Sequence, residues 1–227
     1  MRVIIFGIRD LAELAKFYFE WDSDYNKDTA VVAFTVNKEY LTPEIITEAK
    51  QRLETDSIVP FEDLEQYYPP NEYYLFAPMT ASKMNKNREK IYLEGKKRGY
   101  KFASYISSKA TVLTNKIGEN CFILEDNTIQ PFVEIGNNCI CWSGSHFGHS
   151  SKIEDHTFFT SHVVLSGHCK VNSYSFFGVN STIRDAIVIA EGTLVGMSTT
   201  ITKNTDPWSV YIGSPGVKQN KSSIEVM

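Results

Sequence analysis

Large apolar residues recur every six positions through the second half of the chain. The series runs unbroken through Ile117, Ile123, Ile129, Ile135, Cys141, Phe147, Ile153, Phe159, Leu165, Val171, Phe177, Ile183, Ile189, Val195 and Ile201. A mostly small or β-branched residue, such as Cys121 or Thr193, follows four places after each one up to Val195. Neither an α-helix nor an ordinary strand has a period of six. The pattern is typical of a hexapeptide β-helix, in which each hexad forms one side of a triangular coil.

Three hexads make one turn, so residues 18 apart lie above one another in roughly five coils about 4.8 Å apart. We expect the coil to begin between Ser107 and Ile117 and to end near Thr202. The segment 204–217 contains Trp208 and two prolines and is suited to cover the open coil end. Residues 218–227 are expected to form a loose tail.

The first half of the chain has a different pattern. Apolar runs predict strands at Arg2–Gly7, Ala30–Val36 and Glu72–Ala77, and Lys101–Ile106 is expected to be extended. Amphipathic stretches predict helices over Asp10–Trp21, Thr42–Leu53, Phe61–Tyr67 and Ser82–Lys97. Alternating strands and helices indicate a small parallel α/β domain. We therefore predict an α/β domain over 1–105, a β-helix over 106–203, and a C-terminal capping segment and tail over 204–227.

The composition excludes several classes of protein. The chain has 227 residues, of which 42% are hydrophobic and 22% charged, and its net charge of −4 offers no basic field for nucleic acid or anionic membrane. No apolar run is long enough to span a bilayer, and Arg9-Asp10 ends the first one too early for a signal peptide. We expect a cytoplasmic protein with no nucleic-acid or membrane partner.

The four cysteines follow the hexad register. Cys121, Cys139 and Cys169 stand at the small-residue position, and Cys141 stands at the large apolar one. The chain has no CxxC pair, so we interpret all four as small hydrophobic residues packed inside the coil.

All five histidines lie between residues 146 and 168. His156, His162 and His168 have the same place in successive hexads, so they point in three directions and cannot hold one metal within a subunit. We predict solvent-facing or interface positions for these three and no metal site.

His149 stands at a different place, two residues after Phe147, and Gly167 lies 18 residues further on, directly above it. A histidine beneath a glycine leaves room for a ligand, and a bare backbone N–H nearby could stabilise an oxyanion. An ordinary surface histidine is the alternative of equal weight.

The α/β start, the hexad run and the stretch WSGSHFGHSSKI at 142–153 together resemble the left-handed β-helix sugar acyltransferases. This family includes bacillosamine and perosamine N-acetyltransferases and sialic acid O-acetyltransferases. Similar segments are SHVVLSG at 161–167, FGVNSTI at 177–183 and GSPGVK at 213–218. The resemblance implies an α/β N-terminal domain with a short parallel sheet, then a left-handed parallel β-helix, assembled as a homotrimer. Handedness comes from the resemblance alone, because crossover connections are generally right-handed.

The resemblance implies an N-acetyltransferase that uses acetyl-CoA or another acyl-CoA to acylate the amino group of a nucleotide-linked amino-dideoxy sugar. His149 would be the general base for direct attack on the thioester, because imidazole titrates near neutral pH. The N–H of Gly167 would stabilise the oxyanion. The acyl-CoA would contact Ser166, Gly167, Gly178, Val179 and Gly196, with its adenine end at Ile212, Gly213 and Pro215.

The nucleotide-linked sugar would bind the N-terminal domain near strand ends, where ligands bind in open parallel sheets. The candidate contacts are Gly7, Ile8, Arg9, Thr35, Asn37, Pro78, Met79, Met84 and Asn85, together with His146 in the coil. Arg9 suits a diphosphate, and a surface charge is the alternative. Met84, Asn85 and Arg88 open a basic helix whose alternative role is a solvated face.

Two positions depart from the family pattern. Ser150 follows His149, where family members often have an acid that orients the imidazole. Either Glu154 or Asp155 takes that role, or the substrate carries more of the proton transfer. The first loop, Gly7–Asp10, has one glycine and is not a dinucleotide-binding fingerprint.

Three functions are alternatives to N-acetylation of an amino sugar. O-acetylation of a sugar hydroxyl is the nearest alternative, because the fold serves both reactions. A metal enzyme of the γ-carbonic anhydrase type needs a five-residue histidine spacing that is missing here, and leaves the α/β domain unexplained. A non-catalytic scaffold such as an ice-binding protein needs a flat array of threonines, whereas the outward positions mix Glu, His, Lys and Asn.

Overall fold

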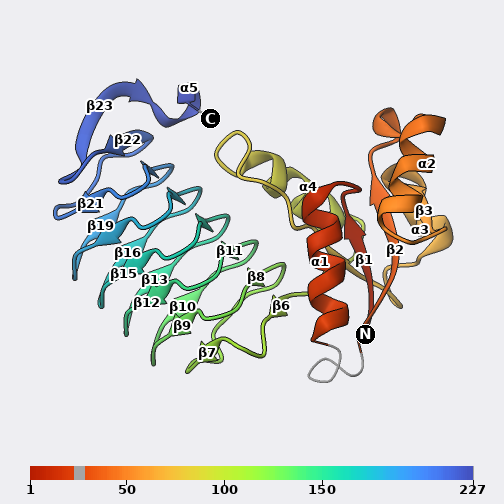
Figure 1. The fold of residues 1–227 in the computed structure, drawn as a ribbon, viewed down its shortest axis with the longest axis horizontal. Coiled ribbons are helices and arrows are strands. Elements are labelled where there is room, and N and C mark those ends of the chain that lie inside the picture. Colours follow the sequence, from red (N-terminus) through yellow and green to blue (C-terminus); the bar gives the residue numbers. More distant parts are fainter. Residues whose placement is uncertain (23–28, 227) are drawn as a thin grey trace. The chain divides into compact units, whose positions relative to one another are not determined.

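The computed structural model describes residues 1–22 and 29–226 (Figure 1). The chain divides into two compact units. The first, which we call the α/β unit, comprises Met1–Thr80 and Lys90–Ala103, and the second, the coil unit, comprises Ala81–Glu89 and Ser104–Met227.

The α/β unit is built on a five-stranded parallel sheet of order β3-β2-β1-β4-β5. Its strands are β1 (Arg2–Phe6), β2 (Ala30–Val36), β3 (Ile58–Pro60), β4 (Tyr74–Phe76) and β5 (Lys101–Phe102). Its helical segments are α1 (Asp10–Trp21), η1 (Lys38–Tyr40), α2 (Pro43–Arg52), η2 (Phe61–Asp63) and α3 (Leu64–Tyr67). The strand order reverses between β1 and β4, and in such sheets a ligand crevice lies at the carboxyl ends of the strands.

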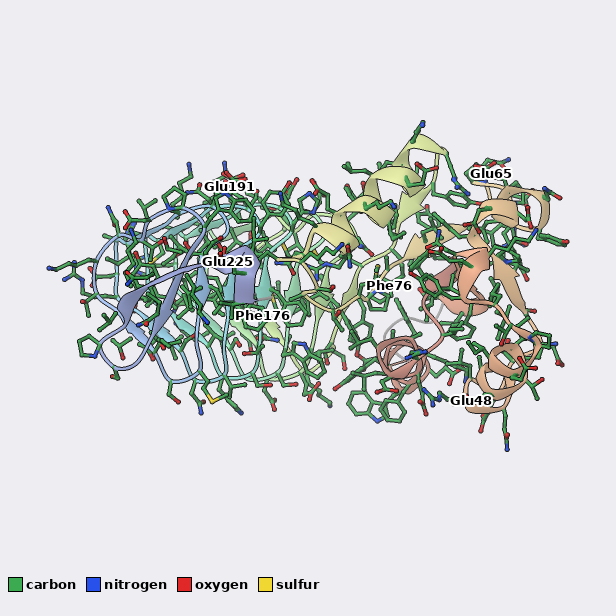
Figure 2. The ribbon with its side chains drawn as sticks, turned by 90° about the horizontal axis from the view of Figure 1, so that it is seen from above. Glu48, Glu65, Phe76, Phe176, Glu191 and Glu225 are labelled. Carbon is green, nitrogen blue, oxygen red and sulfur yellow. The ribbon has the colours of Figure 1, made fainter. Side chains whose placement is uncertain are left out.

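Aromatic pairs pack in the core of the α/β unit. Phe6 and Phe61 meet edge to face at 5.1 Å, and Phe19 and Phe76 do so at 5.3 Å. Phe76 is fully buried in the unit and is labelled in Figure 2. Strand β1 is buried at four of its five positions, as expected of a central parallel strand covered on both faces.

Two local features differ from the sequence-based expectation. Strand β3 was not predicted, because Ile58–Pro60 is short and ends in proline. Helix α4 (Lys86–Lys97) begins four residues later than expected. The reason is a left-handed turn at Lys83, Met84 and Asn85, with φ of 51°, 50° and 65°. This turn carries Met84 into an apolar cluster with Leu194 and Val210 of the coil unit.

The coil unit is a parallel β-helix of three sheets. Its two-residue strands are β6 (Tyr105–Ile106), β7 (Thr111–Val112), β8 (Phe122–Ile123), β9 (Thr128–Ile129), β10 (Glu134–Ile135), β11 (Ile140–Cys141), β12 (His146–Phe147), β13 (Lys152–Ile153), β14 (Phe158–Phe159), β15 (Val164–Leu165), β16 (Lys170–Val171), β17 (Phe176–Phe177), β18 (Thr182–Ile183), β19 (Val188–Ile189), β20 (Leu194–Val195) and β21 (Thr200–Ile201). From β8 to β21 partners lie 18 residues apart, as in the pairing of Ile140 with Phe158, which confirms the predicted stacking. The first two strands, β6 and β7, pair with residues 17 positions further on. The first coil strand is β6, so the coil begins slightly earlier than expected.

Three corners join the sheets, and we call them corners A, B and C. Corner A follows β12 and β15, corner B follows β14 and β17, and corner C follows β13 and β16. One residue per corner takes a positive φ, and these residues recur every six positions from Asn120 to Ser198. Asn, Asp, Gly and His are the residues that tolerate this conformation best. His156, His162 and His168 occupy such positions at corners C, B and A, so they do point in three directions.

The coil interior is a stack of apolar side chains. Phe159 and Phe177 stack face to face at 4.4 Å, and Phe147 meets Phe159 edge to face at 5.0 Å. All four cysteines are buried and free, which confirms their interpretation as core residues.

The C-terminal segment closes the last coil with regular structure. Strand β22 (Ser209–Ile212) pairs in parallel with β20, and β23 (Val217–Ser222) pairs antiparallel with β22. Helix α5 (Ser223–Val226) follows. The expected loose tail over 218–227 is therefore wrong for the described residues; Met227 lies outside them. Strand β23 carries no apolar pattern, because it is an edge strand held by backbone pairing. Exposed lysines such as Lys218 protect such an edge from pairing with another chain.

Phe159→Ala should lower the free energy of unfolding by about 3–5 kcal/mol, because it opens a cavity inside the stack. Val164→Ala, on the outer face of β15, the next strand along the chain, should change the free energy of unfolding by less than about 0.5 kcal/mol. Urea unfolding followed by circular dichroism measures both. Equal effects of the two substitutions would contradict the stacked core.

Candidate functional site

His149 lies exposed at corner A, in the turn after β12. Its backbone N–H donates to Oε1 of Gln130 at 2.8 Å. Its ring lies against the next coil, because a Cβ added to Gly167 would be 3.0 Å from the Nε2 atom of His149. The structure thus brings together the two residues that the sequence paired, and a side chain at position 167 would crowd the imidazole.

The backbone N–H of Gly167 is open beside this imidazole. Within residues 1–22 and 29–226, no acceptor pairs with it. A Cβ added to Gly148 would lie 2.4 Å from the Gly167 nitrogen and would cover it. Gly148 was not among the predicted site residues. The sequence feature that could have indicated it is the spacing of 19 positions between Gly148 and Gly167, two glycines at the same corner. A base beside a free N–H donor is an arrangement that suits acyl transfer.

His168 also belongs to this corner. Its ring meets the ring of His149 edge to face, with centroids 4.8 Å apart and an interplanar angle of 87°. The hexad register alone predicts only an outward-pointing position for His168.

The two carboxylates considered as partners of His149 lie elsewhere. Asp155 is at corner C, where its Oδ1 accepts the backbone N–H of Asn137 at 2.7 Å. Glu154 pairs with Lys152 at 3.2 Å. Neither carboxylate is at corner A, so the expectation that one of them orients the imidazole is wrong within the chain.

The predicted acyl-CoA contacts fall at two corners. Ser166 and Gly167 are at corner A, whereas Gly178, Val179 and Gly196 are at corner B. Corner B repeats the geometry of corner A, because a Cβ on Gly178 would lie 2.4 Å from the nitrogen of Met197. In the described part of the chain no acceptor pairs with that N–H either.

The remaining predicted acyl-CoA contacts are at the C-terminal end of the coil. Ile212 is half exposed at the end of β22, and a Cβ on Gly196 would lie 2.5 Å from its Cγ2 atom. Gly213 has a φ of +100°, and Pro215, which follows a cis peptide bond, is exposed.

The α/β unit holds most of the predicted sugar-nucleotide contacts. Gly7 (φ +126°), Ile8 and Arg9 follow β1, and Pro78 and Met79 follow β4. These two segments therefore flank the point where the strand order reverses. Arg9 and Gly7 are at least partly exposed, whereas Ile8 and Pro78 are buried.

The contacts predicted around β2 already have partners inside the protein. Thr35 is fully buried, and its hydroxyl donates to the carbonyl of Val59 at 2.9 Å. Asn37 donates to Glu62 at 3.1 Å. The burial of Thr35 disfavours direct contact with a ligand.

The predicted sugar contacts of the coil unit differ in exposure. Met84 and Asn85 are fully buried, and the amide of Asn85 donates to the carbonyls of Tyr174 and Ser175, each at 3.4 Å. Their burial argues against the expected ligand contact. His146 lies half-buried on β12.

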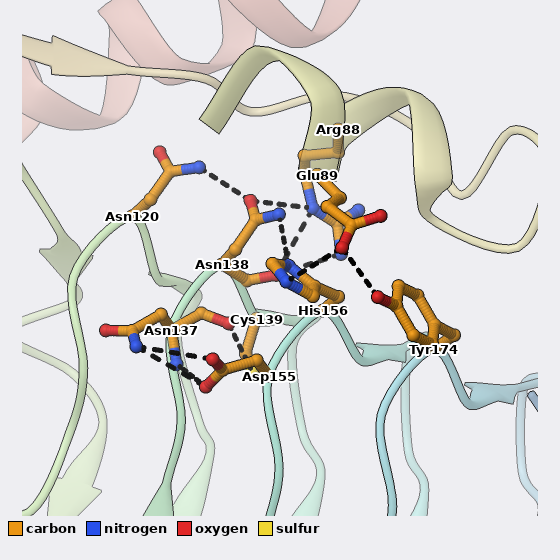
Figure 3. A network of polar contacts seen from close by, with 9 residues as sticks. All are labelled: Arg88, Glu89, Asn120, Asn137, Asn138, Cys139, Asp155, His156 and Tyr174. Atoms are coloured by element: carbon orange, nitrogen blue, oxygen red, sulfur yellow. Dashed lines mark hydrogen bonds and ion pairs between the residues drawn. The ribbon is translucent and has the colours of Figure 1, made fainter. Parts of the chain in front are cut away.

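Corner C holds a second polar cluster, drawn in Figure 3. Asn120 donates to Asn138 at 2.7 Å, and the amide nitrogen of Asn138 contacts Nδ1 of His156 at 2.8 Å. The His156 ring stacks on Tyr174 at 5.4 Å, and Tyr174 stacks on Trp208 at 5.8 Å. One side chain per coil thus continues a column along this corner.

Arg88 and Glu89 form hydrogen bonds with residues of this corner C column. Arg88 is fully buried and donates to the carbonyls of Asn138 and Thr157 at 3.0 and 3.1 Å. Burial lowers the pKa of Arg88 to about 10, so it stays charged at neutral pH. Glu89 accepts the hydroxyl of Tyr174 at 2.6 Å. Arg88 is therefore a buried structural residue, not part of the exposed basic face or ligand site expected from the sequence.

His156 is buried within the chain, at neither the solvent-facing nor the interface position expected for it. Burial lowers its pKa, and the Glu89 carboxylate, 3.7 Å from Nε2, opposes the shift. Its Nδ1 atom faces an amide nitrogen of Asn138, which fits a neutral imidazole that carries its proton on Nε2.

No protein-family model matches the chain. A curated relative, the acyl-[acyl-carrier-protein]–UDP-N-acetylglucosamine O-acyltransferase of Sinorhizobium fredii, is 26% identical over 119 residues, which are 49% of this chain. The match spans only 44% of that protein's length.

Solved structures match nearly the whole chain. The acetyltransferase domain of PglB from Neisseria gonorrhoeae has a TM-score of 0.80 at 14% identity, covering 96% of this chain and 99% of that one. A mutant of perosamine N-acetyltransferase from Caulobacter crescentus, solved with CoA and GDP-perosamine, also scores 0.80, at 17% identity and coverage of 97% and 98%. WeeI from Acinetobacter baumannii scores 0.77 at 16% identity, covering 96% and 100%.

The chain has the fold of these acetyltransferases. The resemblance stated from the sequence is thereby confirmed, as is the fold class of an α/β start followed by a left-handed parallel β-helix. In the described residues, no helix is both long and apolar enough to cross a bilayer, and no three His, Cys, Asp or Glu residues gather as metal ligands do.

The buried His156 should make stability depend on pH. Its lowered pKa means that the unfolded chain binds a proton more readily than the folded one. The stabilising contribution is complete above the ordinary value of 6.5 and is lost as the pH falls from there through the folded-state pKa. Thermal unfolding between pH 8 and pH 5 should show this loss in the wild type.

His156→Asn should weaken that pH dependence, because asparagine suits the positive φ and extends the Asn120–Asn138 column without a titrating group. His162→Asn is the matched control, with an exposed histidine at φ 59°. A pH profile that His156→Asn leaves unchanged would show that another group controls acid stability.

Proposed function

We propose that the protein is an acyl-CoA-dependent N-acetyltransferase acting on the amino group of a nucleotide-linked amino-dideoxy sugar. The observation that carries this proposal is the exposed imidazole of His149 beside the open N–H of Gly167. The fold supports it, since the structures that share it include one with acetyl-CoA and one with CoA and GDP-perosamine.

The reaction is a direct transfer. The sugar amine attacks the thioester carbonyl, a C–N bond forms, and His149 accepts the proton that the amine loses. The carbonyl oxygen becomes an oxyanion that accepts the N–H of Gly167. Collapse of the tetrahedral intermediate breaks the C–S bond, and the CoA sulfur leaves as a thiol with the proton from His149.

Gly148 and Gly178 are what keep the backbone donors of this site available. Each leaves one N–H of the next coil uncovered, that of Gly167 at corner A and that of Met197 at corner B. The first would serve the oxyanion, and the second would donate to an amide carbonyl of the pantetheine arm. Ile212, Gly213 and Pro215 would meet the adenine end.

In the sheet that contains β12 and β15, corner B lies at the amino ends of the strands and corner A at their carboxyl ends. A groove lined by both corners therefore needs corner A of one copy and corner B of another. A cyclic trimer supplies three such grooves, which is why we propose a homotrimer. The sugar nucleotide would bind at Gly7, Arg9 and Met79, with Arg9 on the diphosphate.

O-acetylation is the second candidate. Its support is the match to an O-acyltransferase, since the same base can take a proton from a hydroxyl.

His149→Ala should lower kcat about 10²- to 10⁴-fold, the usual contribution of a general base. Release of free CoA thiol from acetyl-CoA, measured against nucleotide-linked 4-amino-4,6-dideoxy sugars and matched hydroxyl sugars, tests this. Lys170→Ala, an exposed change on another face, is the control. Turnover on hydroxyl sugars alone would move the assignment to O-acylation, and turnover that survives His149→Ala would remove His149 as the base.

Mixed assemblies test the shared groove. Val179→Arg should raise the KM for acetyl-CoA at corner B, and His149→Ala removes the base at corner A. Coexpression of the two variants should restore activity, because about a quarter of the grooves in a randomly mixed trimer are intact. Light scattering gives the number of copies. A monomer, or the absence of any restored activity, would refute the shared groove.

A further inference from the structure

We propose that His168 is the positioning residue for His149 and that it acts through its ring, in the role that a carboxylate would otherwise have. The inference rests on the proposed function, in which His149 is the general base. It concerns this chain's own corner A, where Ser150 follows the base.

The geometry of the two rings carries the proposal. The imidazoles of His149 and His168 are nearly perpendicular, at 87°, with centroids 4.8 Å apart. In such a pair the positive edge of one ring meets the electron-rich face of the other. The backbone ladder sets the spacing, because the N–H of His168 donates to the carbonyl of His149 at 2.9 Å.

Nothing else among the described residues holds the imidazole through a polar contact. No carboxylate forms a hydrogen bond or ion pair with His149 there, and Glu154 and Asp155 are engaged elsewhere. Gly167 leaves one side of the ring open, as the reaction requires. Among residues 1–22 and 29–226, the ring of His168 is the one aromatic partner found for His149. A ring packed against the imidazole in this way would limit its rotation.

The corner explains how His168 reaches the base. Ser150 and His168 are 18 residues apart and occupy the same left-handed position in successive coils, with φ of 57° and 59°. His168, at this position in the upper coil, therefore lies beside His149, the residue before Ser150. The orienting group has thus moved up one coil from the place where the family pattern expects an acid.

The consequence is specific to the chemical step. An imidazole that rotates freely still allows both substrates to bind, but its Nε2 atom is aligned with the attacking amine for less of the time. Loss of His168 should therefore lower kcat and leave both KM values unchanged.

The test compares His168→Ala with His168→Phe. Phenylalanine keeps a ring at the same place, and Phe132 shows that the left-handed corner position of this chain accepts one, at φ 66°. Asp126→Ala, an exposed change at φ 59° at corner B, is the control for altering a corner residue. The first measurement is kcat and both KM values in the thiol-release assay.

The second measurement does not depend on turnover. Carbon-13 NMR relaxation at the Cε1 atom of His149 reports how far its ring is ordered. His168→Ala should lower kcat roughly three- to tenfold, the range expected for an edge-to-face pair, and should lower the ring order. His168→Phe should restore both, and Asp126→Ala should change neither.

Several results would overturn the proposal. An unchanged kcat and ring order in His168→Ala would remove any positioning role. A loss of kcat that His168→Phe fails to restore would show that the ring nitrogens act, not the ring contact. If the wild type acylates none of the acceptors, the proposed function fails separately, and the ring order alone then decides whether His168 positions His149.

Discussion

The parallel backbone ladder of the β-helix is the constraint on which the rest of the structure depends. It holds each residue above the residue 18 places earlier, as the pairings of Ile140 with Phe158 and of Lys152 with Lys170 show. A coil this tight must turn at three corners, and each turn forces one residue into a left-handed conformation. The ladder therefore decides which side chains point inward and which meet at the corners.

At corner A the same constraint assembles the proposed site. The ladder places Gly167 over His149, and the missing side chain of Gly148 leaves the Gly167 N–H uncovered. The strained corner position of the next coil carries His168 to the edge of the imidazole. A left-handed backbone is costly for most residues, and here it presents the His168 ring beside the imidazole of the proposed base.

Corner C uses the ladder for a different purpose. Its column of Asn120, Asn138, His156 and Tyr174 is covered by Arg88 and Glu89, so that polar groups removed from water find partners (Figure 3). A buried polar network of this kind stabilises the fold only when its members are satisfied. It fixes the left-handed turn at 83–85 and the start of α4 on the coil. Corners A and C thus differ because different residues occupy the same positions of the repeat.

The sequence by itself determined the repeat, the inward side chains and the pairing of His149 with Gly167, because a strict period of six admits one way of stacking. It also placed α1 and β2, whose apolar periodicity is local. It missed β23, whose pairing is made by the backbone and leaves no apolar pattern. It also missed the burial of His156 and Arg88 and the contact of His168 with His149. Those depend on the conformation of single corner residues and on contacts with a segment 50 or more positions away, so only the tertiary structure decided them.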